Sequence, residues 1–550
     1  MKTINSKDLQ EMLISGSNNL YNHYPEIDAL NVFPVPDGDT GMNMNLTLAS
    51  GAKEIQNRSD SDVYSIATAF SKGLLMGARG NSGVITSQIF RGFAQSLEGH
   101  KTIDAELLGE AFANGSKVAY KAVMRPVEGT ILTVIRESST SLKEFTKSES
   151  DILKVFKYFL NEAKSSLKHT PELLPVLKEV GVVDSGGAGL VKILEGMLSS
   201  LNGKFIEKKA ISRDNTDNSA QQAVESDEFG YCTEFILRLD PENKKPFIES
   251  RFKSVLANHG NSLVVVQDDD IVKVHVHTLT PGAILTYGQS FGEFVKIKVE
   301  NMTEQHTSLQ EKKDGEQQPN EPVSELKEPT KDVGLVAVAA GNGVAEAFKE
   351  LGVDQIITGG QTMNPSINDI IKAIKDTNAK TVYVFPNNSN IVMAALQARD
   401  VLHDDLEVVV IQTKTIPQGI AAVSQFSPDL SVEENVSNMK EVIAHISSGE
   451  ITYAVKDTTM NGVSIKKDDF MAIANKKVIC CESKPEKALA KMLKSMIRSD
   501  SYLATIFVGE GVSDKILNSL KKELPEQYPH VEFDIRRGDQ PVYNYLVGIE

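Results

Sequence analysis

Two acidic side chains near the amino terminus have the chemical type and spacing that suit a divalent cation. Asp37 and Asp39 flank Gly38 in the segment Asn31-Val-Phe-Pro-Val-Pro-Asp-Gly-Asp-Thr-Gly-Met-Asn43. Because glycine frees the backbone, both carboxylates can turn toward one point. Mg²⁺ is typically held by one or two carboxylates together with phosphate oxygens. The segment therefore predicts metal binding, with an ordinary Asp-Gly turn as the alternative.

Three further glycine-rich segments lie in the same amino-terminal part of the chain. They are Gly77-Ala-Arg-Gly-Asn-Ser-Gly83, Glu128-Gly-Thr130 and Asp184-Ser-Gly-Gly-Ala-Gly189. Apolar residues around them recur at helical spacing, so we expect these segments to feed helix starts, where free backbone N–H groups can bind an anion. Any one of these glycine-rich segments is explained as a simple break between helices. Four such segments in one helical region, with Asp37–Gly41 as the fourth, favour a nucleotide site. Arg79 is the cation best placed to offset the charge that develops during phosphoryl transfer.

The composition excludes several classes of protein. A chain of 550 residues is too long for one core, which predicts about three domains. The net charge of -16 argues against a nucleic-acid partner, and no apolar run is long enough to span a bilayer. The beginning of the chain is typical of an amphipathic helix, not of a signal peptide. The three cysteines, Cys232, Cys480 and Cys481, offer no obvious disulfide, which favours the cytoplasm.

Shifts in composition and periodicity predict three structured regions separated by two polar linkers. In order they are an all-α region at 1–202, a linker at 203–227, a small α+β region at 228–305, a disordered linker at 306–332, and a doubly wound α/β region at 333–550. Within the last region, the loops Thr362–Ser366 and Asn387–Asn390 are rich in hydroxyl and amide groups. Such loops at the carboxyl ends of strands either bind a ligand or cap the helix that follows.

The α+β region carries a second set of reactive side chains. His275 and His277 alternate along one expected strand, and Cys232 and Glu234 alternate along another, so each pair shares a face of its strand. If the two faces coincide, the cluster suits a tetrahedral Zn²⁺ site or a thiolate kept ionised by histidine. The alternative is a buried cysteine beside two histidines at the edge of the strand.

The residues quoted above resemble a known family. Asp37-Gly-Asp39-Thr-Gly, Gly80-Asn-Ser-Gly83, Gly129-Thr-Ile-Leu132 and Asp184-Ser-Gly-Gly187 are similar to the nucleotide-binding subunit of the dihydroxyacetone kinases. The full segment from residue 31 to residue 43 resembles more closely the ATP-binding subunit of bacterial fatty acid kinase. This resemblance covers the whole chain in its domain order. It implies a first domain built as a barrel of about eight helices.

The resemblance also implies roles for individual residues. Two Mg²⁺ ions would bridge Asp37, Asp39 and the ATP phosphates, with Asn31 or Asp28 as a third metal ligand, because Phe33 occupies the position of the aspartate found in the sugar-kinase branch. The phosphates would contact Thr40, Gly41, Met42, Asn43, Asn81, Ser82 and Gly83. The base and sugar would contact Thr130, Ile131, Leu132, Asp184, Ser185 and Gly186. The family has the same Cys and His-Val-His-Thr pattern in its middle domain.

By resemblance, the chain transfers the γ-phosphoryl group of ATP to the carboxylate of a fatty acid carried by a separate fatty-acid-binding protein, which docks on the last region. The product would be an acyl phosphate for phospholipid synthesis, and the chain would be a homodimer. A carboxylate with a pKa of about 4 is already ionised, so no general base is needed. The alternatives are a small-polyol kinase, a nucleotide-binding regulatory scaffold, and a separate zinc hydrolase-like activity in the middle region.

Overall fold

The structure is a computed structural model that describes the chain outside residues 32–37, 210–230, 240–251, 253–254, 257–260, 269–270, 279–280, 302–328 and 361–363. It forms two compact units. Unit 1 combines Met1–Ile211 with Leu326–Glu550, and unit 2 comprises Ser212–Glu325. Both expected linkers fall mostly on residues outside the described ones, so the domain boundaries stay a prediction.

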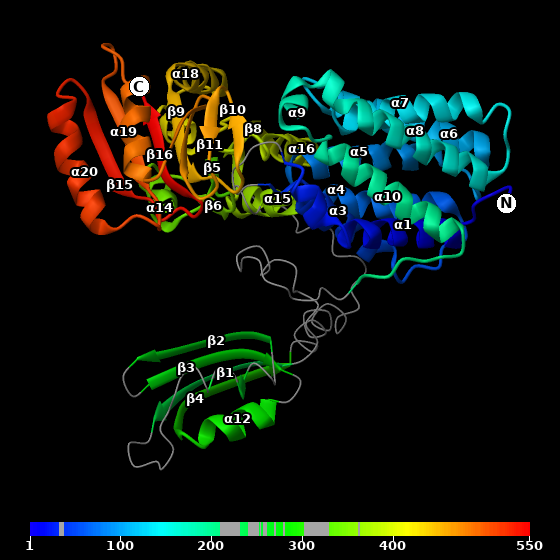
Figure 1. Cartoon of the computed structure of the whole chain (residues 1–550), viewed down its shortest axis with the longest axis horizontal. Helices are drawn as coiled ribbons and strands as arrows, with labels where there is room; N and C mark the ends of the chain where they lie inside the picture. The colour runs from blue at the N-terminus through cyan, green and yellow to red at the C-terminus, as the bar shows by residue number, and fades with distance from the viewer. Residues whose placement is uncertain are drawn as a thin grey trace. The chain divides into compact units, whose positions relative to one another are not determined.

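The amino-terminal part of unit 1 is all-helical, as predicted (Figure 1). Its helices are α1 (Ser6–Tyr21), α2 (Tyr24–Asp28), α3 (Thr40–Ile55), α4 (Val63–Gly77), α5 (Gly80–Ser96), α6 (Ala105–Ala122), α7 (Ile131–Phe145), α8 (Ile152–Leu173), α9 (Pro175–Val180) and α10 (Ser185–Leu201). We call residues 1–209 the helical region.

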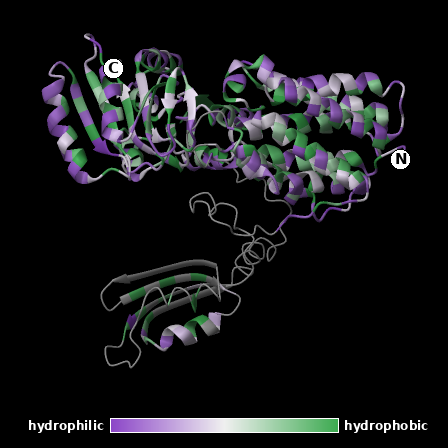
Figure 2. Ribbon diagram, in the orientation of Figure 1, coloured by the Kyte–Doolittle hydropathy of each residue, from purple (hydrophilic) through white to green (hydrophobic). Residues whose placement is uncertain are grey.

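One hydrophobic core holds these helices together, and their polar faces turn outward (Figure 2). The rings of Phe90, Phe93, Phe112 and Phe159 follow one another through this core with centroids 4.5 to 6.4 Å apart. Each of these side chains is at most 2% exposed. Burying a large apolar side chain contributes about 1.5–3 kcal/mol, so this cluster fixes the helices that place the glycine-rich segments.

The carboxyl-terminal part of unit 1, residues 329–550, begins with the predicted doubly wound sheet. Its elements are β5 (Lys331–Ala339), α14 (Asn342–Glu350), β6 (Gln355–Thr358), α15 (Ile367–Asp376), β7 (Ala379–Phe385), α16 (Val392–Leu402), β8 (Glu407–Val410), α17 (Ile416–Ser424) and α18 (Val432–His445). The four strands are parallel in the order β6-β5-β7-β8. Helices α15 and α16 pack on one face, and α14, α17 and α18 on the other. The strand order reverses between β5 and β7.

A second sheet follows, which the strand pattern did not predict. Its elements are β9 (Ser447–Tyr453), β10 (Thr458–Met460), β11 (Val463–Ile465), β12 (Phe470–Ala474), β13 (Lys477–Glu482), α19 (Pro485–Met496), β14 (Leu503–Val508), α20 (Asp514–Gln527), β15 (Glu532–Arg537) and β16 (Tyr543–Ile549). The order is β13-β12-β9-β16-β14-β15, with only β14 and β15 parallel, while β10 and β11 form a separate hairpin. We call residues 329–550 the α/β region.

Unit 2 contains an antiparallel sheet with the order β2-β3-β1-β4. Its elements are β1 (Tyr231–Leu239), β2 (Asn261–Asp268), β3 (Ile271–Thr278), α12 (Pro281–Gln289) and β4 (Gly292–Asn301). The two strands expected to carry Cys232 with Glu234 and His275 with His277 are confirmed as β1 and β3. Phe235, Leu237, Val274 and Val276 are fully or almost fully buried at alternate positions, which marks the core face of the sheet.

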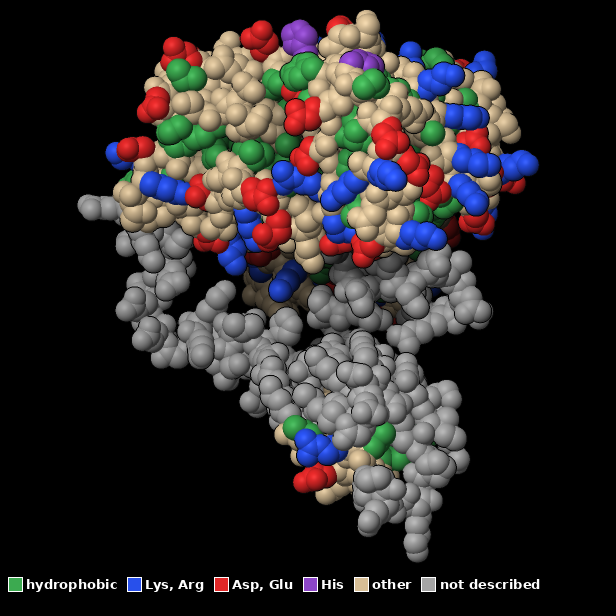
Figure 3. Space-filling model, turned by 90° about the vertical axis from the view of Figure 1, so that its left-hand side faces the viewer, with side chains coloured by type: hydrophobic (Ala, Val, Ile, Leu, Met, Phe, Trp, Pro, Cys, Tyr) green, Lys and Arg blue, Asp and Glu red, His purple; other side chains and the backbone are tan. Residues whose placement is uncertain are grey.

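No helix in the described part of the chain is both long and apolar enough to cross a bilayer. The end of the molecule that Figure 3 presents carries lysine and arginine side chains interspersed with aspartate and glutamate. A nucleic-acid-binding face typically shows basic side chains gathered in one patch. This face therefore lacks that electrostatic signature.

Candidate nucleotide site

All four glycine-rich segments become helix amino termini. Helix α3 begins directly after Asp39, α7 after Thr130 and α10 after Asp184. The remaining segment differs slightly from expectation, because Gly80–Gly83 forms the first turn of α5 and does not precede it. Gly80 has a φ of +57°, a value at which glycine is favoured. Free N–H groups and the helix dipole make each of these ends suitable for an anion.

The fold brings these ends together in two adjoining pairs. At the first pair, Ser82 Oγ donates to Thr40 O at 3.4 Å, and a Cβ on Gly83 would lie only 2.3 Å from Thr47 Oγ1. Glycine is therefore what lets α5 approach α3. At the second pair, a Cβ on Gly186 would lie 3.3 Å from Ile131 Cβ, so α10 and α7 also meet at their starts. Helix α10 packs against both α7 and α3.

Asp39 differs from the other aspartates that precede helices in this region. The carboxylates of Asp62, Asp104, Asp151 and Asp184 each accept a hydrogen bond from a backbone N–H of the helix that follows. Asp39 occupies the same position before α3, yet its side chain makes no capping bond. An aspartate before a helix ordinarily stabilises it in that way. The Asp39 carboxylate instead accepts a hydrogen bond from Asn364 Nδ2.

The other aspartate of the predicted pair, Asp37, lies outside the described residues. Its role beside Asp39 stays a prediction from the sequence. Gly38 and Asp39 are described, and a Cβ on Gly38 would lie 3.2 Å from the side chain of Asn31. The chain therefore returns close to Asn31 directly before α3, which keeps Asn31 near the expected metal site.

Asp28 performs the capping task in place of Asp39. Its Oδ1 accepts from Gly41 N at 2.6 Å and from Met42 N at 3.3 Å, across the first turn of α3. Burial raises the pKa of Asp28 to about 7, against the opposing effect of these two hydrogen bonds. Asn31 contributes its main-chain oxygen, which accepts from Lys456 Nζ at 2.9 Å. The choice between Asn31 and Asp28 as a metal ligand stays a prediction.

Side chains of the α/β region reach this site. Asn364 Nδ2 donates to Asp39 Oδ2 at 2.5 Å, and the main-chain oxygen of Asn364 accepts from Arg79 Nη1 at 2.8 Å. Asn81 Nδ2 donates to Asn390 Oδ1 at 3.1 Å. The guanidinium of Arg79 also lies 3.7 Å from the Asp369 carboxylate. Arg79 thus lies beside the α5 start but faces the α/β region.

Asn364 and Asn390 belong to the two amide-rich loops noted in the sequence. Helix capping explains Ser366, which accepts from Asp369 N at the start of α15. It does not explain Asn364, whose side chain crosses to the helical region. Sequence reasoning missed this role, although the density of amides in the loop was a signal. The contact of Lys456 with the main-chain oxygen of Asn31 could not be predicted, because no motif surrounds Lys456 in the sequence.

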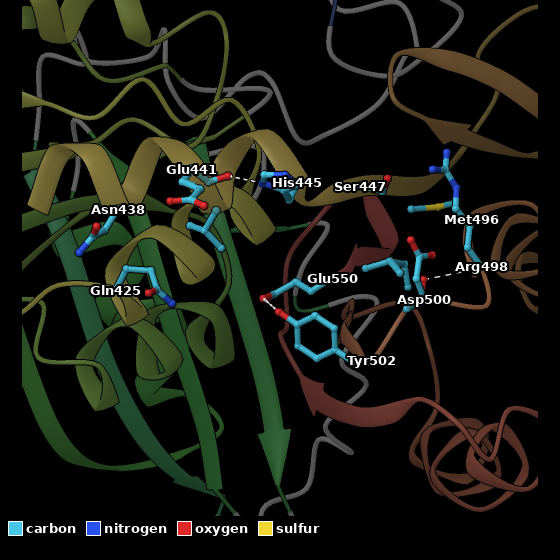
Figure 4. Close-up of a pocket in the computed structure, with 13 residues that line it drawn as sticks. Gln425, Asn438, Glu441, His445, Ser447, Met496, Arg498, Asp500, Tyr502 and Glu550 are labelled. Carbon is cyan, nitrogen blue, oxygen red and sulfur yellow. Dashed lines mark hydrogen bonds between the residues drawn. The ribbon is translucent and has the colours of Figure 1, made fainter. Parts of the chain in front are cut away.

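Two cavities lie among the described residues of the α/β region. One of about 230 Å³ is lined by residues that follow β5 and β7, where the strand order reverses, including Gly341, Asn387 and Asn388. Open α/β sheets bind ligands at such a switch point. The larger cavity, of about 460 Å³, lies among α18, β9 and the segment after α19 (Figure 4). There Tyr502 Oη donates to Glu550 Oε2 at 3.2 Å, and the lining does not include Asn364.

The middle region aligns the predicted Cys/His set along its backbone. Strands β1 and β3 pair so that Cys232 lies opposite His277 and Glu234 lies opposite His275. Directly opposed positions share one face of a sheet. The side chains of these residues lie outside the described part of the chain. Among the described side chains no group of three or more His, Cys, Asp and Glu is arranged to hold a metal ion, so Zn²⁺ gains no support from them.

Comparisons with known proteins agree with this architecture. Residues 34–199 match the DAK2 domain, residues 228–309 match the middle domain of the FakA-like fatty acid kinase subunits, and residues 334–550 match the C-terminal domain of the same subunits. These matches define the class, a kinase-type protein with an amino-terminal DAK2 domain. The chain belongs to the FakA-like family of fatty acid kinase subunits, which confirms the resemblance drawn from the residues.

Relatives match over the full length of the chain. "Protein YloV" from Bacillus subtilis is 45% identical over 100% of both chains. "Uncharacterized protein SAR1202" from Staphylococcus aureus is 43% identical over 100% of this chain and 99% of its own.

Solved structures show weaker likeness. The fatty acid binding protein DegV from Bacillus subtilis is 12% identical over 40% of this chain and 98% of its own, with a TM-score of 0.30. The dihydroxyacetone kinase of C. freundii is 21% identical over 35% of this chain and 34% of its own, with a TM-score of 0.27.

Proposed function

We propose that this protein transfers the γ-phosphoryl group of ATP to the carboxylate of a fatty acid presented by a separate fatty-acid-binding protein. The product is an acyl phosphate for phospholipid synthesis. Membership of the FakA-like family of fatty acid kinase subunits supports this proposal. The observation that carries it is the Asp39 carboxylate, which precedes α3 but is released from capping because Asp28 caps that helix instead.

The residues around Asp39 fit magnesium and a nucleotide. Mg²⁺ prefers oxygen ligands, and Asp39 supplies a carboxylate beside the amide of Asn364, while Asn81 lies in the first turn of α5. Among the described residues, the oxygens Asn81 Oδ1 and Asn364 Oδ1 are both buried and find no hydrogen-bond partner. Buried polar atoms of this kind are rare in folded proteins and often indicate a missing ligand, ion or water. The donor set therefore suits a hydrated cation with bound phosphates.

Each part of the helical region then has a role toward the substrate. Asp37 and Asp39 hold the cations, with Asn31 or Asp28 as a third ligand. The starts of α3 and α5 bind phosphate oxygens through backbone N–H groups, and the starts of α7 and α10 bind the base and sugar. Bound Mg²⁺ supplies charge neutralisation at the transferring phosphoryl group. Because the acceptor is already a carboxylate, positioning replaces general-base catalysis.

The remaining regions are assigned to interactions. We propose that the α/β region docks the fatty-acid-binding carrier and that the chain forms a homodimer in the cytoplasm. The carrier supplies the acyl chain, so chain-length preference belongs to that partner. Nothing in this arrangement requires a membrane-spanning segment of this chain.

The test is ADP and acyl phosphate production by the full chain with a fatty-acid-loaded carrier and Mg-ATP. Asp39→Ala should lower the rate by at least about 100-fold, because a lost metal ligand removes several kcal/mol of transition-state stabilisation. Asp104→Ala is the matched control, because Asp104 also precedes a helix and caps it. That control should keep its activity while losing about 1 kcal/mol of stability.

Two results would contradict the proposal. One is an Asp39→Ala variant that stays folded and keeps more than half of the wild-type rate. The other is ADP release with dihydroxyacetone in the absence of the carrier, which would favour the small-polyol kinase.

A further inference from the structure

Within unit 1, the α/β region packs directly on the start of α5. Ala78 and Val84 of the helical region belong to the same buried cluster as Ile367, Ile370 and Ile391. The backbone joins the two regions as well, because Ile367 N donates to Ala78 O at 3.2 Å. Contacts that are buried and hydrogen-bonded hold two segments in one fixed geometry. Residues 364–366, which directly precede α15, are therefore held firmly against the expected metal site.

Asn364 is the residue of that loop that meets Asp39. It is 1% exposed, and its main-chain oxygen is held by Arg79. A carboxylate only accepts hydrogen bonds, so Nδ2 and not Oδ1 must face Asp39. This orientation leaves Asn364 Oδ1 buried at the same place, with no partner in the part of the chain that the structure describes. A Cβ on Gly80 would lie 3.5 Å from Asn364 Nδ2 and 2.5 Å from Asn43 Nδ2, so the amide lies at the first turn of α5.

We infer that Asn364 is a positioning residue of the metal–nucleotide site, contributed by the α/β region to the helical region. The inference rests on the proposed function. The Nδ2 group holds one oxygen of Asp39, which directs the other oxygen to the cation, as outer hydrogen-bond partners do for metal-binding carboxylates. Asn364 Oδ1, which has no partner among the described residues, would be available to accept a hydrogen bond at the same site when the magnesium–nucleotide is bound. Asn390 supports the neighbouring Asn81 through a second amide pair.

This assignment gives the α/β region a part in ATP binding as well as in docking. Asp39 and Asn364 are 325 residues apart in the chain, and the α/β region also holds Arg79 through Asn364 and Asp369. A nucleotide that binds at the α3 and α5 starts therefore contacts both regions. A change in the position of the α/β region would then change the affinity of the site for magnesium.

The test is calorimetric titration of the intact chain with ATP, at several Mg²⁺ concentrations and in EDTA. Asn364→Ala should weaken Mg-dependent ATP binding by about 10-fold or more, because a hydrogen bond to a charged group is lost. The Mg²⁺ concentration for half-maximal binding should rise, while binding in EDTA stays unchanged. Asn438→Ala, at an exposed position on α18, is the control and should match wild type.

Asn364→Asp has the same shape but places a second carboxylate against Asp39, so it should weaken Mg-dependent binding at least as much as alanine does. If the alanine variant does not fold, the aspartate variant and Asn364→Ser decide by the same criterion. Folded variants that bind Mg-ATP within twofold of wild type would overturn the inference. Tighter binding would overturn it too, since the contact would then compete with the metal. Wild-type protein that shows no Mg-dependent binding would instead refute the proposed kinase function.

Discussion

At the residue scale, the proposed function depends on two aspartates near the start of α3 that have different roles. Asp28 caps α3 through Gly41 N and Met42 N, and Asp39, which precedes the helix, makes no capping bond. A carboxylate engaged by backbone N–H groups is a poorer metal ligand than one that faces away from its helix. The pairing therefore explains how one helix start can be both stable and open to a cation.

The raised pKa of Asp28 gives a pH-dependent prediction. A folded-state pKa of about 7 exceeds the usual 3.8, so the folded state binds the proton more tightly than the unfolded state. Stability contributed by Asp28 is therefore greatest below about pH 4, and it is lost as pH rises through about 7. Asp28→Asn removes this loss, so its stability relative to wild type should rise by about 1 kcal/mol per pH unit in that window.

Urea unfolding in EDTA at pH 5 and pH 8 measures this difference. The free energy of unfolding of Asp28→Asn, relative to that of wild type, should be higher at pH 8 than at pH 5. An equal difference at both pH values would mean that Asp28 is already ionised in the folded chain.

At the element scale, two units of the α/β region have the same order of strand, loop, helix and strand, and they contact each other. In both β5-α14-β6 and β14-α20-β15 the first strand is followed by a Gly-x-Gly-Val segment, at residues 341–344 and 509–512, and the two strands of the unit pair in parallel. The start of α14 in the first unit contacts the end of β15 in the second unit, since Gly343 N donates to Gly538 O at 3.0 Å. The close approach requires glycine, because a Cβ on Gly343 would lie 1.8 Å from Arg537 O.

Gly343→Ala should therefore lower the free energy of unfolding by about 2 kcal/mol or more, because backbone must shift to admit the methyl group. Gly511→Ala is the matched control, since it lies in the corresponding loop but is exposed, and its Cβ would meet only Asn544 Nδ2 at 3.4 Å. That control should stay within about 0.5 kcal/mol of wild type. Urea denaturation compares both variants, and equal losses would show that the contact does not constrain the loop.

At the scale of the whole molecule, the helical and α/β regions form one compact unit, whereas residues 212–325 form another. The shared cluster around Ile367 and Val84 means that ordering one region at the nucleotide site should order the other.

Saturation with Mg-ATP should therefore stabilise unit 1 as a whole. At about 100 times the dissociation constant, ligand linkage adds about 2.7 kcal/mol. Hydrogen exchange should slow both at the start of α5 and in α15, and EDTA should abolish the effect. Slowing confined to the helical region would show that the two regions respond independently.

The sequence by itself predicted the features that depend on neighbouring residues. The starts of α3, α5, α7 and α10 follow from glycine-rich segments before apolar periodicity, and β1, β3 and β5–β8 follow from runs of β-branched residues. The prediction of a metal-binding aspartate pair and the resemblance to the family both came from the spacing of residues within short segments of the sequence. Helix starts and strand alternation are local because each depends on hydrogen bonds and side-chain faces within a few residues.

Only the tertiary structure decided which distant groups meet. The mixed sheet could not be predicted, because β9 pairs with β12 and β16 across long connections that no local pattern specifies. The contact between Asp39 and Asn364 exists because α15 and α16 share a core cluster with the start of α5. Such a contact is set by how apolar faces pack together, and packing depends on the whole set of buried side chains.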